Sequence, residues 1–183
     1  MVPVKGDITF ILGGARSGKS TAAERLARSG DRVLFVATAE ALDEEMQKRI
    51  RIHRQGRPNA WDTLEEPRAL VSALQPRLAH YDVFLIDCMT MWVSNLLLAM
   101  DGHPDPERRV VEETRRLLDL MQDSDAAWIV VSNEVGMGIV PASPLGRVFR
   151  DALGRANQMI ADRSSRVLLM VAGLSFEAPL SSE

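Results

Sequence analysis

The sequence predicts an α/β fold in which a mostly parallel sheet is flanked by helices, and two observations lead to this prediction. Five short runs are almost continuously apolar, as in strands that are buried on both faces. Segments with helical periodicity separate these runs, and such alternation favours parallel pairing of the strands. The 183 residues are 46% hydrophobic, which is enough for one sizeable core, so we expect residues 1–183 to form a single domain.

The predicted strands and helices alternate along the chain. The strands are expected at residues 8–12, 32–38, 83–87, 127–133 and 166–173. The helices are expected at residues 19–28 and 42–55, after Pro67, and at residues 89–100, 107–122 and 145–163. Helix-favouring residues fill the first helix, and apolar residues recur at spacings of three and four residues in the second. Pro67 suits the first turn of a helix.

Two segments lack such patterns. Residues 136–146 are too rich in Gly and Pro for a helix and are the best candidate for a lid, and residues 175–183 are expected to be a loose tail.

Composition and charge exclude several classes of protein. A net charge of −3 argues against binding to nucleic acid or to a membrane surface, since both tasks usually need a basic stripe. The chain shows neither a signal peptide nor an apolar run of the roughly 18 residues that span a bilayer, so we expect a cytoplasmic protein with no membrane span. Cys88 is the only cysteine, so no internal disulfide can form, and with only three histidines a structural zinc site is not expected.

A phosphate-binding loop follows the first predicted strand and precedes the first predicted helix. The segment matches the pattern G-x-x-x-x-G-K-[ST], whose glycines let backbone N–H groups point at phosphates while the lysine reaches the β- and γ-phosphates. The helix N-terminus adds a favourable dipole for an anion. The alternative is a glycine-rich turn without a ligand, against which the flanking strand and helix argue. The residues of this loop are Gly13, Gly14, Ala15, Arg16, Ser17, Gly18, Lys19 and Ser20.

A magnesium site is predicted beside this loop. Ser20 is the hydroxyl ligand that the pattern supplies, and Asp87 ends an apolar strand, where a Walker B carboxylate stands. The alternative for Asp87 is structural, because an aspartate after a buried strand also starts a turn or caps the next helix.

His53 lies on the apolar face of the helix predicted at residues 42–55. Leu42, Met46, Ile50 and His53 are spaced by four, four and three residues, so they share that face. Arg54 and Arg57 follow where the helix ends, which predicts a place for a phosphate. A histidine on an apolar face is more often structural than catalytic, so both roles stay open on physical grounds.

Four segments together resemble one known family, the bifunctional adenosylcobinamide kinase and adenosylcobinamide-phosphate guanylyltransferase of cobalamin biosynthesis. These segments are the phosphate loop, residues 37–61, residues 132–141 (SNEVGMGIVP) and residues 154–158 (GRANQ). The resemblance runs from about residue 8 to residue 173. It implies a RecA-like, three-layer P-loop NTPase fold and a homotrimer.

The resemblance also implies two reactions. ATP or GTP would phosphorylate adenosylcobinamide, and the resulting adenosylcobinamide phosphate would then receive GMP from GTP, with Mg²⁺ as the metal cofactor. His53 matches the histidine that carries GMP in the family, within the segment that also holds Arg54, Arg57 and Pro58. Some relatives have two adjacent histidines here, whereas this chain has Ile52 before His53. The other nucleotide-binding positions implied by the resemblance are Ala37, Thr38, Ala39, Arg54, Gln55, Gly56, Arg57, Glu65 and Asp87.

Glu134 follows the strand predicted at residues 127–133 and is a candidate for orienting or deprotonating the acceptor hydroxyl. Its alternative role is to accept hydrogen bonds from loop N–H groups.

Two other functions fit parts of the sequence. One is a plain P-loop kinase in which His53 is structural, and a covalent nucleotide would distinguish it from the bifunctional enzyme. The other is a nucleotide-driven switch, which is disfavoured because Asn133 is followed by Glu134 rather than by the lysine of a guanine-specifying N-K-x-D segment.

Overall fold

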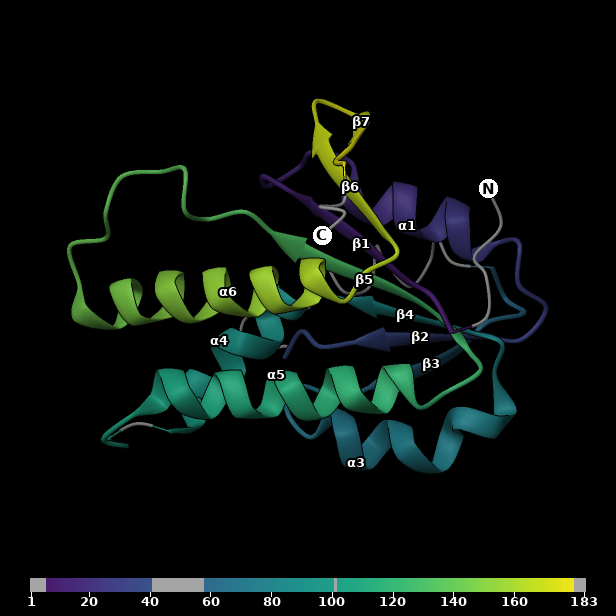
Figure 1. Cartoon of the computed structure of the whole chain (residues 1–183), viewed down its shortest axis with the longest axis horizontal. Helices are drawn as coiled ribbons and strands as arrows, with labels where there is room; N and C mark the ends of the chain where they lie inside the picture. Colours follow the sequence, from purple (N-terminus) through teal and green to yellow (C-terminus); the bar gives the residue numbers. More distant parts are fainter. Residues whose placement is uncertain (1–5, 41–57, 101, 180–183) are drawn as a thin grey trace.

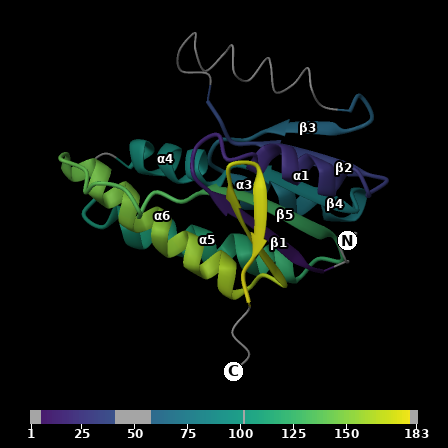
Figure 2. The same cartoon turned by 90° about the horizontal axis from the view of Figure 1, so that it is seen from above.

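A seven-stranded sheet with helices on both faces forms the centre of the protein (Figures 1 and 2). The computed structural model describes residues 6–40, 58–100 and 102–179. The strands lie in the order β3-β2-β4-β5-β1-β6-β7, and all neighbours are parallel except β6 and β7. The predicted α/β class and the mostly parallel sheet are therefore confirmed.

The strands form where the sequence is apolar and rich in β-branched residues. The five predicted runs correspond to β1 (Ile8–Gly13), β2 (Val33–Ala37), β4 (Val83–Asp87), β5 (Ala127–Asn133) and β6 (Arg166–Val171). Two further strands were not predicted, β3 (Asp62–Glu65) and β7 (Leu174–Glu177). Both are short and largely exposed edge strands, so they lack the apolar run by which a buried strand is found.

The loose tail predicted from residue 175 is wrong for residues 175–177. These residues belong to β7, which pairs antiparallel with β6 and places Phe176 opposite Leu169. The ion pair between Arg166 and Glu177 adds a cross-strand contact at 2.9 Å. Backbone pairing of two strands joined by a tight turn orders this segment although its side chains are exposed.

The helices begin and end close to the predicted residues. They are α1 (Lys19–Ala27), α3 (Leu70–Leu74) with the 3-10 helix η1 (Gln75–His80), α4 (Met89–Ala99), α5 (Pro106–Gln122) and α6 (Pro144–Asp162). Asp105 and Ser143 cap the first turns of α5 and α6, each followed by a proline at the first helical position. The segment after Pro67 forms only a short helix, and just before its start the Glu66 carboxylate accepts bonds from the N–H groups of Arg68 and Ala69.

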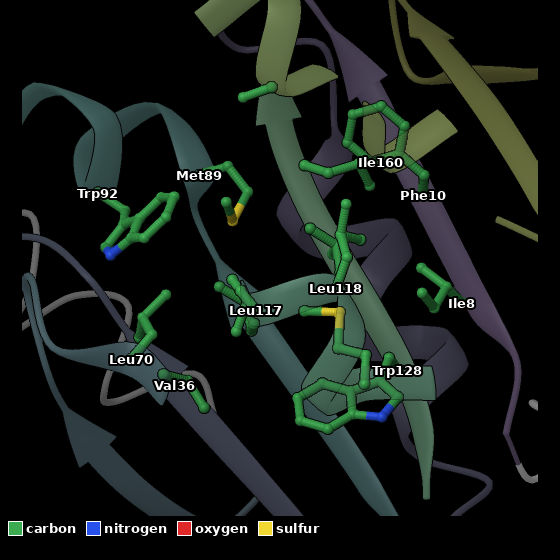
Figure 3. Close-up of a cluster of buried hydrophobic side chains, with 14 of the residues drawn as sticks. Ile8, Phe10, Val36, Leu70, Met89, Trp92, Leu117, Leu118, Trp128 and Ile160 are labelled. Carbon is green, nitrogen blue, oxygen red and sulfur yellow. The ribbon is translucent and has the colours of Figure 1, made fainter. Parts of the chain in front are cut away.

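The two faces of the sheet are covered unequally in the described part of the chain. Alternate strand residues pack on α3, α4, α5 and α6, and their neighbours pack on the alanines of α1. Figure 3 shows the larger of these two clusters, in which Trp128, Leu117 and Leu118 lie between the sheet and the helices. The ring of Trp128 stacks on Phe84 with centroids 4.4 Å apart. No helix within the described ranges is long and apolar enough to cross a membrane.

Candidate nucleotide site

The phosphate loop connects β1 to α1 at the carboxyl edge of the sheet. At Gly13 a Cβ atom would lie 2.3 Å from the carbonyl oxygen of Met170, so only glycine fits between β1 and β6. Gly18 has φ of 94°, a left-handed conformation that favours glycine, and it is the N-cap residue of α1. Gly14, Ala15 and Arg16 are exposed at the tip of the loop, where an anion can reach them.

Lys19 lies under this loop with only 7% of its surface exposed. Its Nζ donates to the carbonyl oxygen of Gly14 at 2.6 Å and to Ser17 Oγ at 3.5 Å. Burial lowers the pKa of Lys19, while the nearby Cys88 and Asp87 raise it in part. The ammonium group is thus held between the phosphate loop and the end of β4.

Strand register brings the predicted site residues to the same edge of the sheet. Ala37 lies opposite both Glu65 of β3 and Asp87 of β4. Gly13 lies opposite Asn133 of β5 and Met170 of β6. Residues that are far apart in the sequence therefore end their strands together, as expected for ligand sites of parallel sheets.

A buried network joins the ends of β2 and β4. The Thr38 hydroxyl donates to the Cys88 carbonyl oxygen at 2.6 Å and accepts from the Cys88 N–H at 2.9 Å. The side-chain amide of Asn95, in α4, donates to the carbonyl oxygens of Thr38 at 2.7 Å and Pro67 at 3.2 Å. Asn95 is 3% exposed, so these bonds hold three chain segments together away from water.

The expected metal ligands are compatible with magnesium. Asp87 is half-buried beside Lys19, and Ser20 lies in the first turn of α1. Cys88, not Asp87, is the N-cap residue of α4, so the capping alternative for Asp87 is not what the structure shows. Hydroxyl and carboxylate oxygens are donors that Mg²⁺ prefers, with phosphate oxygens and water completing its shell. Among the described residues no group of three or more His, Cys, Asp and Glu forms a metal cluster.

Glu134 lies directly beside the phosphate loop. Its backbone N–H donates to the Gly13 carbonyl oxygen at 3.1 Å, and its carboxylate accepts from the Gly136 N–H. The second bond is the loop-satisfying role considered from the sequence. A role in catalysis stays a prediction, to which the structure adds proximity to Gly13.

Several predicted site residues lie outside the described part of the chain. They are the nucleophile candidate His53 and the nucleotide-binding candidates Arg54, Gln55, Gly56 and Arg57, together with the helix predicted at residues 42–55. Of the remaining candidates, Ala39 follows the Thr38 network and Glu65 is exposed at the end of β3.

Sequence reasoning missed two features that support the site. One is Asn95, whose partners lie 57 and 28 residues away and leave no local pattern. The other is the turn between β6 and β7, where the Gly173 N–H donates to the Ser17 carbonyl oxygen at 3.0 Å. A Cβ atom at Gly18 would lie 3.3 Å from the Gly173 Cα, so the turn packs against the phosphate loop.

A family model and individual relatives with matching descriptions are similar to this chain. The family described as CobU, "Cobinamide kinase / cobinamide phosphate guanyltransferase", matches residues 9–178. The bifunctional adenosylcobalamin biosynthesis protein CobU of Salmonella typhimurium is 43% identical over 90% of this chain and 96% of its own. The protein of the same description named CobP, from Pseudomonas aeruginosa, is 46% identical over 95% of this chain and 97% of its own.

Solved structures identify the fold. The flagellar accessory protein FlaH of Methanocaldococcus jannaschii superposes with a TM-score of 0.56 and 14% identity, covering 98% of this chain and 80% of its own. The RadB recombinase superposes with a TM-score of 0.53 and 15% identity, covering 91% of this chain and 75% of its own. The chain shares the fold of these two proteins, so the predicted RecA-like fold is confirmed.

Proposed function

Because the chain belongs to the cobinamide kinase and cobinamide phosphate guanyltransferase family, we propose that it catalyses both reactions on the adenosylated corrinoid. In the first, ATP or GTP phosphorylates adenosylcobinamide. In the second, GTP gives GMP to adenosylcobinamide phosphate, forming adenosylcobinamide-GDP and releasing pyrophosphate. The observation that carries this proposal is the family match over residues 9–178, which spans the phosphate loop and the carboxyl edge of the sheet.

The kinase step uses the phosphate loop. Backbone N–H groups of the loop and the dipole of α1 hold the triphosphate, and the Lys19 ammonium exchanges its Gly14 contact for the β- and γ-phosphates. The acceptor hydroxyl attacks the γ-phosphorus, the bond to the β-phosphate oxygen breaks, and the nucleoside diphosphate leaves. Glu134, one residue beyond β5 and bonded to Gly13, is the candidate that takes the hydroxyl proton.

The guanylyl step passes through a covalent intermediate on His53. A neutral imidazole nitrogen attacks the α-phosphorus of GTP, the bond to the β-phosphate oxygen breaks, and pyrophosphate leaves. The corrinoid phosphate then attacks the phosphoramidate and releases the histidine. Arg54 and Arg57 supply positive charge for the phosphates in this proposal.

Mg²⁺, held by Ser20 and Asp87, would neutralise phosphate charge in both steps. The remaining nucleotide contacts are assigned to Ala37, Thr38, Ala39, Gln55, Gly56 and Glu65. A homotrimer in the cytoplasm completes the proposal, and both attributes rest on the resemblance and on the sequence alone.

A labelling experiment separates this enzyme from a plain kinase. The purified protein is incubated with magnesium and GTP labelled at the α-phosphate, denatured, and held at neutral or acidic pH. We expect acid-labile label in the wild type and in His80→Ala, a control that removes an exposed histidine in η1, and no label in His53→Ala. A folded wild type that binds GTP without retaining label would support a simple kinase and contradict the guanylyl step.

A further inference from the structure

The loop between β5 and α6 combines two properties that are rare on a protein surface. Residues 135–146, which comprise most of this loop and the first turn of α6, contain no charged side chain, although 26% of the whole chain is charged. Met137, Ile139 and Val140 are 84%, 97% and 59% exposed. Single exposed apolar side chains are ordinary, but contiguous ones mark binding surfaces.

Two further exposed apolar residues lie beside the end of this loop, where they line a cavity together with Ser143. Leu98 of α4 and Leu145 of α6 are also more than half exposed, so five of the eight exposed large hydrophobic residues in the described ranges belong to this region. The same two leucines line a cavity of about 280 Å³ between α4 and the start of α6. We name Met137, Ile139, Val140, Leu98 and Leu145 the apolar platform.

The loop is fixed at both ends. At its start, the Glu134 N–H donates to Gly13 of the phosphate loop at 3.1 Å, and the Glu134 carboxylate accepts from the Gly136 N–H. At its end, the Arg147 guanidinium donates to the carbonyl oxygens of Pro141 at 3.1 Å and Ala142 at 2.7 Å. The apolar side chains therefore belong to a segment that is anchored by hydrogen bonds at both ends. Figure 1 shows this segment as an arch beyond the end of β5 and over α6.

The first anchor connects the apolar platform to the phosphate site. An acceptor hydroxyl must reach the γ-phosphate held by the phosphate loop, so the rest of the acceptor has to lie next to that loop. A nucleotide would require charged or polar groups for its phosphates, which residues 135–146 lack. An acceptor with a broad apolar surface and uncharged amide groups suits this surface instead.

We propose that the apolar platform binds the corrin macrocycle of adenosylcobinamide and thereby presents its hydroxyl to the phosphate loop. This inference rests on the proposed function, because it takes the corrinoid as the acceptor. Met137 and Ile139 supply apolar contact with the macrocycle, and the loop anchored at Gly13 sets the distance to the nucleotide.

The test compares two double variants. Met137→Ser with Ile139→Ser removes apolar area from the platform, and Leu174→Ser with Phe176→Ser removes it from β7, where the side chains are 63% and 55% exposed. For each protein the KM for adenosylcobinamide at saturating GTP, guanylyl-enzyme formation without corrinoid, and sedimentation are measured. We expect the platform variant to raise the KM at least tenfold with labelling and sedimentation unchanged, and the β7 variant to match the wild type.

Two outcomes would overturn the inference. An unchanged KM in the platform variant would show that the corrinoid does not use this surface. Dissociation into smaller species, with the KM restored at high protein concentration, would assign the surface to contact between copies of the chain. Phosphorylation of adenosylcobinamide by the wild type is measured before either variant. Its absence would contradict the proposed function itself.

Discussion

Asn95 gives the sharpest test of how the site is held together. Its side-chain amide donates to the Thr38 and Pro67 carbonyl oxygens, and Asn95 is only 3% exposed. Two replacements perturb these bonds in different ways. Asn95→Ala removes both donors, whereas Asn95→Asp keeps the shape but places a carboxylate against two carbonyl oxygens.

The expected losses follow from the cost of unpaired buried groups. A buried acceptor that loses its donor costs about 1–3 kcal/mol, and Pro67 is half-buried and recovers part of this from water. Asn95→Ala should therefore lower the free energy of unfolding by about 2–3 kcal/mol. Asn95→Asp should cost more at pH 7, since a buried charge without a partner is more expensive than a missing bond.

The pH dependence of the aspartate variant has a definite sign. Burial and two facing carbonyl oxygens raise the pKa of the new carboxyl group above its value in the unfolded chain. The folded state then binds more protons than the unfolded state, so the variant should gain stability relative to the wild type as the pH falls from 7 to 5. The protonated carboxyl can donate one of the two lost bonds.

Urea unfolding at pH 5 and pH 7, followed by tryptophan fluorescence, measures these differences. Asn157→Ala is the matched comparison, because this buried amide of α6 donates to a single acceptor among the described residues, the Asn133 carbonyl oxygen at 3.1 Å. It should cost less than Asn95→Ala. GTP binding should weaken in the Asn95 variants, since Thr38 and the end of β4 lose their common support. An Asn95→Asp variant as stable as the wild type at pH 7 would refute the reasoning.

Two further predictions concern the phosphate loop and the only cysteine. Gly13→Ala should lower the melting temperature and abolish nucleotide binding, because the new Cβ would lie 2.3 Å from the Met170 carbonyl oxygen. Calorimetry with and without GTP measures both effects. Normal GTP binding by the variant would contradict the close packing at Gly13. Burial raises the pKa of Cys88 from 9.0 to about 11, so iodoacetamide at pH 8 should react about 100-fold more slowly than with a free thiol. The stability linked to this thiol is present below pH 9 and is lost as the pH rises toward 11, a slope that Cys88→Ala should remove.

The sequence predicted those parts of the protein whose cause is local. The phosphate loop is a contiguous sequence pattern between an apolar strand and a helix, and runs of apolar residues predict the buried strands. The position of Asp87 at the end of β4 also followed from such a run. These features depend on neighbours in the chain, which a sequence displays.

Features that depend on distant partners could not be predicted. β3 and β7 are strands because β2 and β6 offer them unpaired edges, while their own side chains are mostly exposed. Asn95 sits in an apolar helix, where its amide shows no sign of the carbonyl oxygens it meets. The exposure of Met137 and Ile139 could not be predicted either, because it depends on how tertiary contacts hold the two ends of the loop.

The place of β1 in the sheet also bears on how the chain matures during synthesis. β1 is synthesised before the other described strands, yet both of its neighbours, β5 and β6, come from the last third of the given sequence. One hydrogen-bonding edge of the nascent β1 therefore lacks its partner until residue 133 has been added, and the other until residue 171, which exposes an apolar strand to aggregation in the meantime. Chains released before residue 173 would lack the turn that supports Ser17, so we expect them to retain nucleotide poorly.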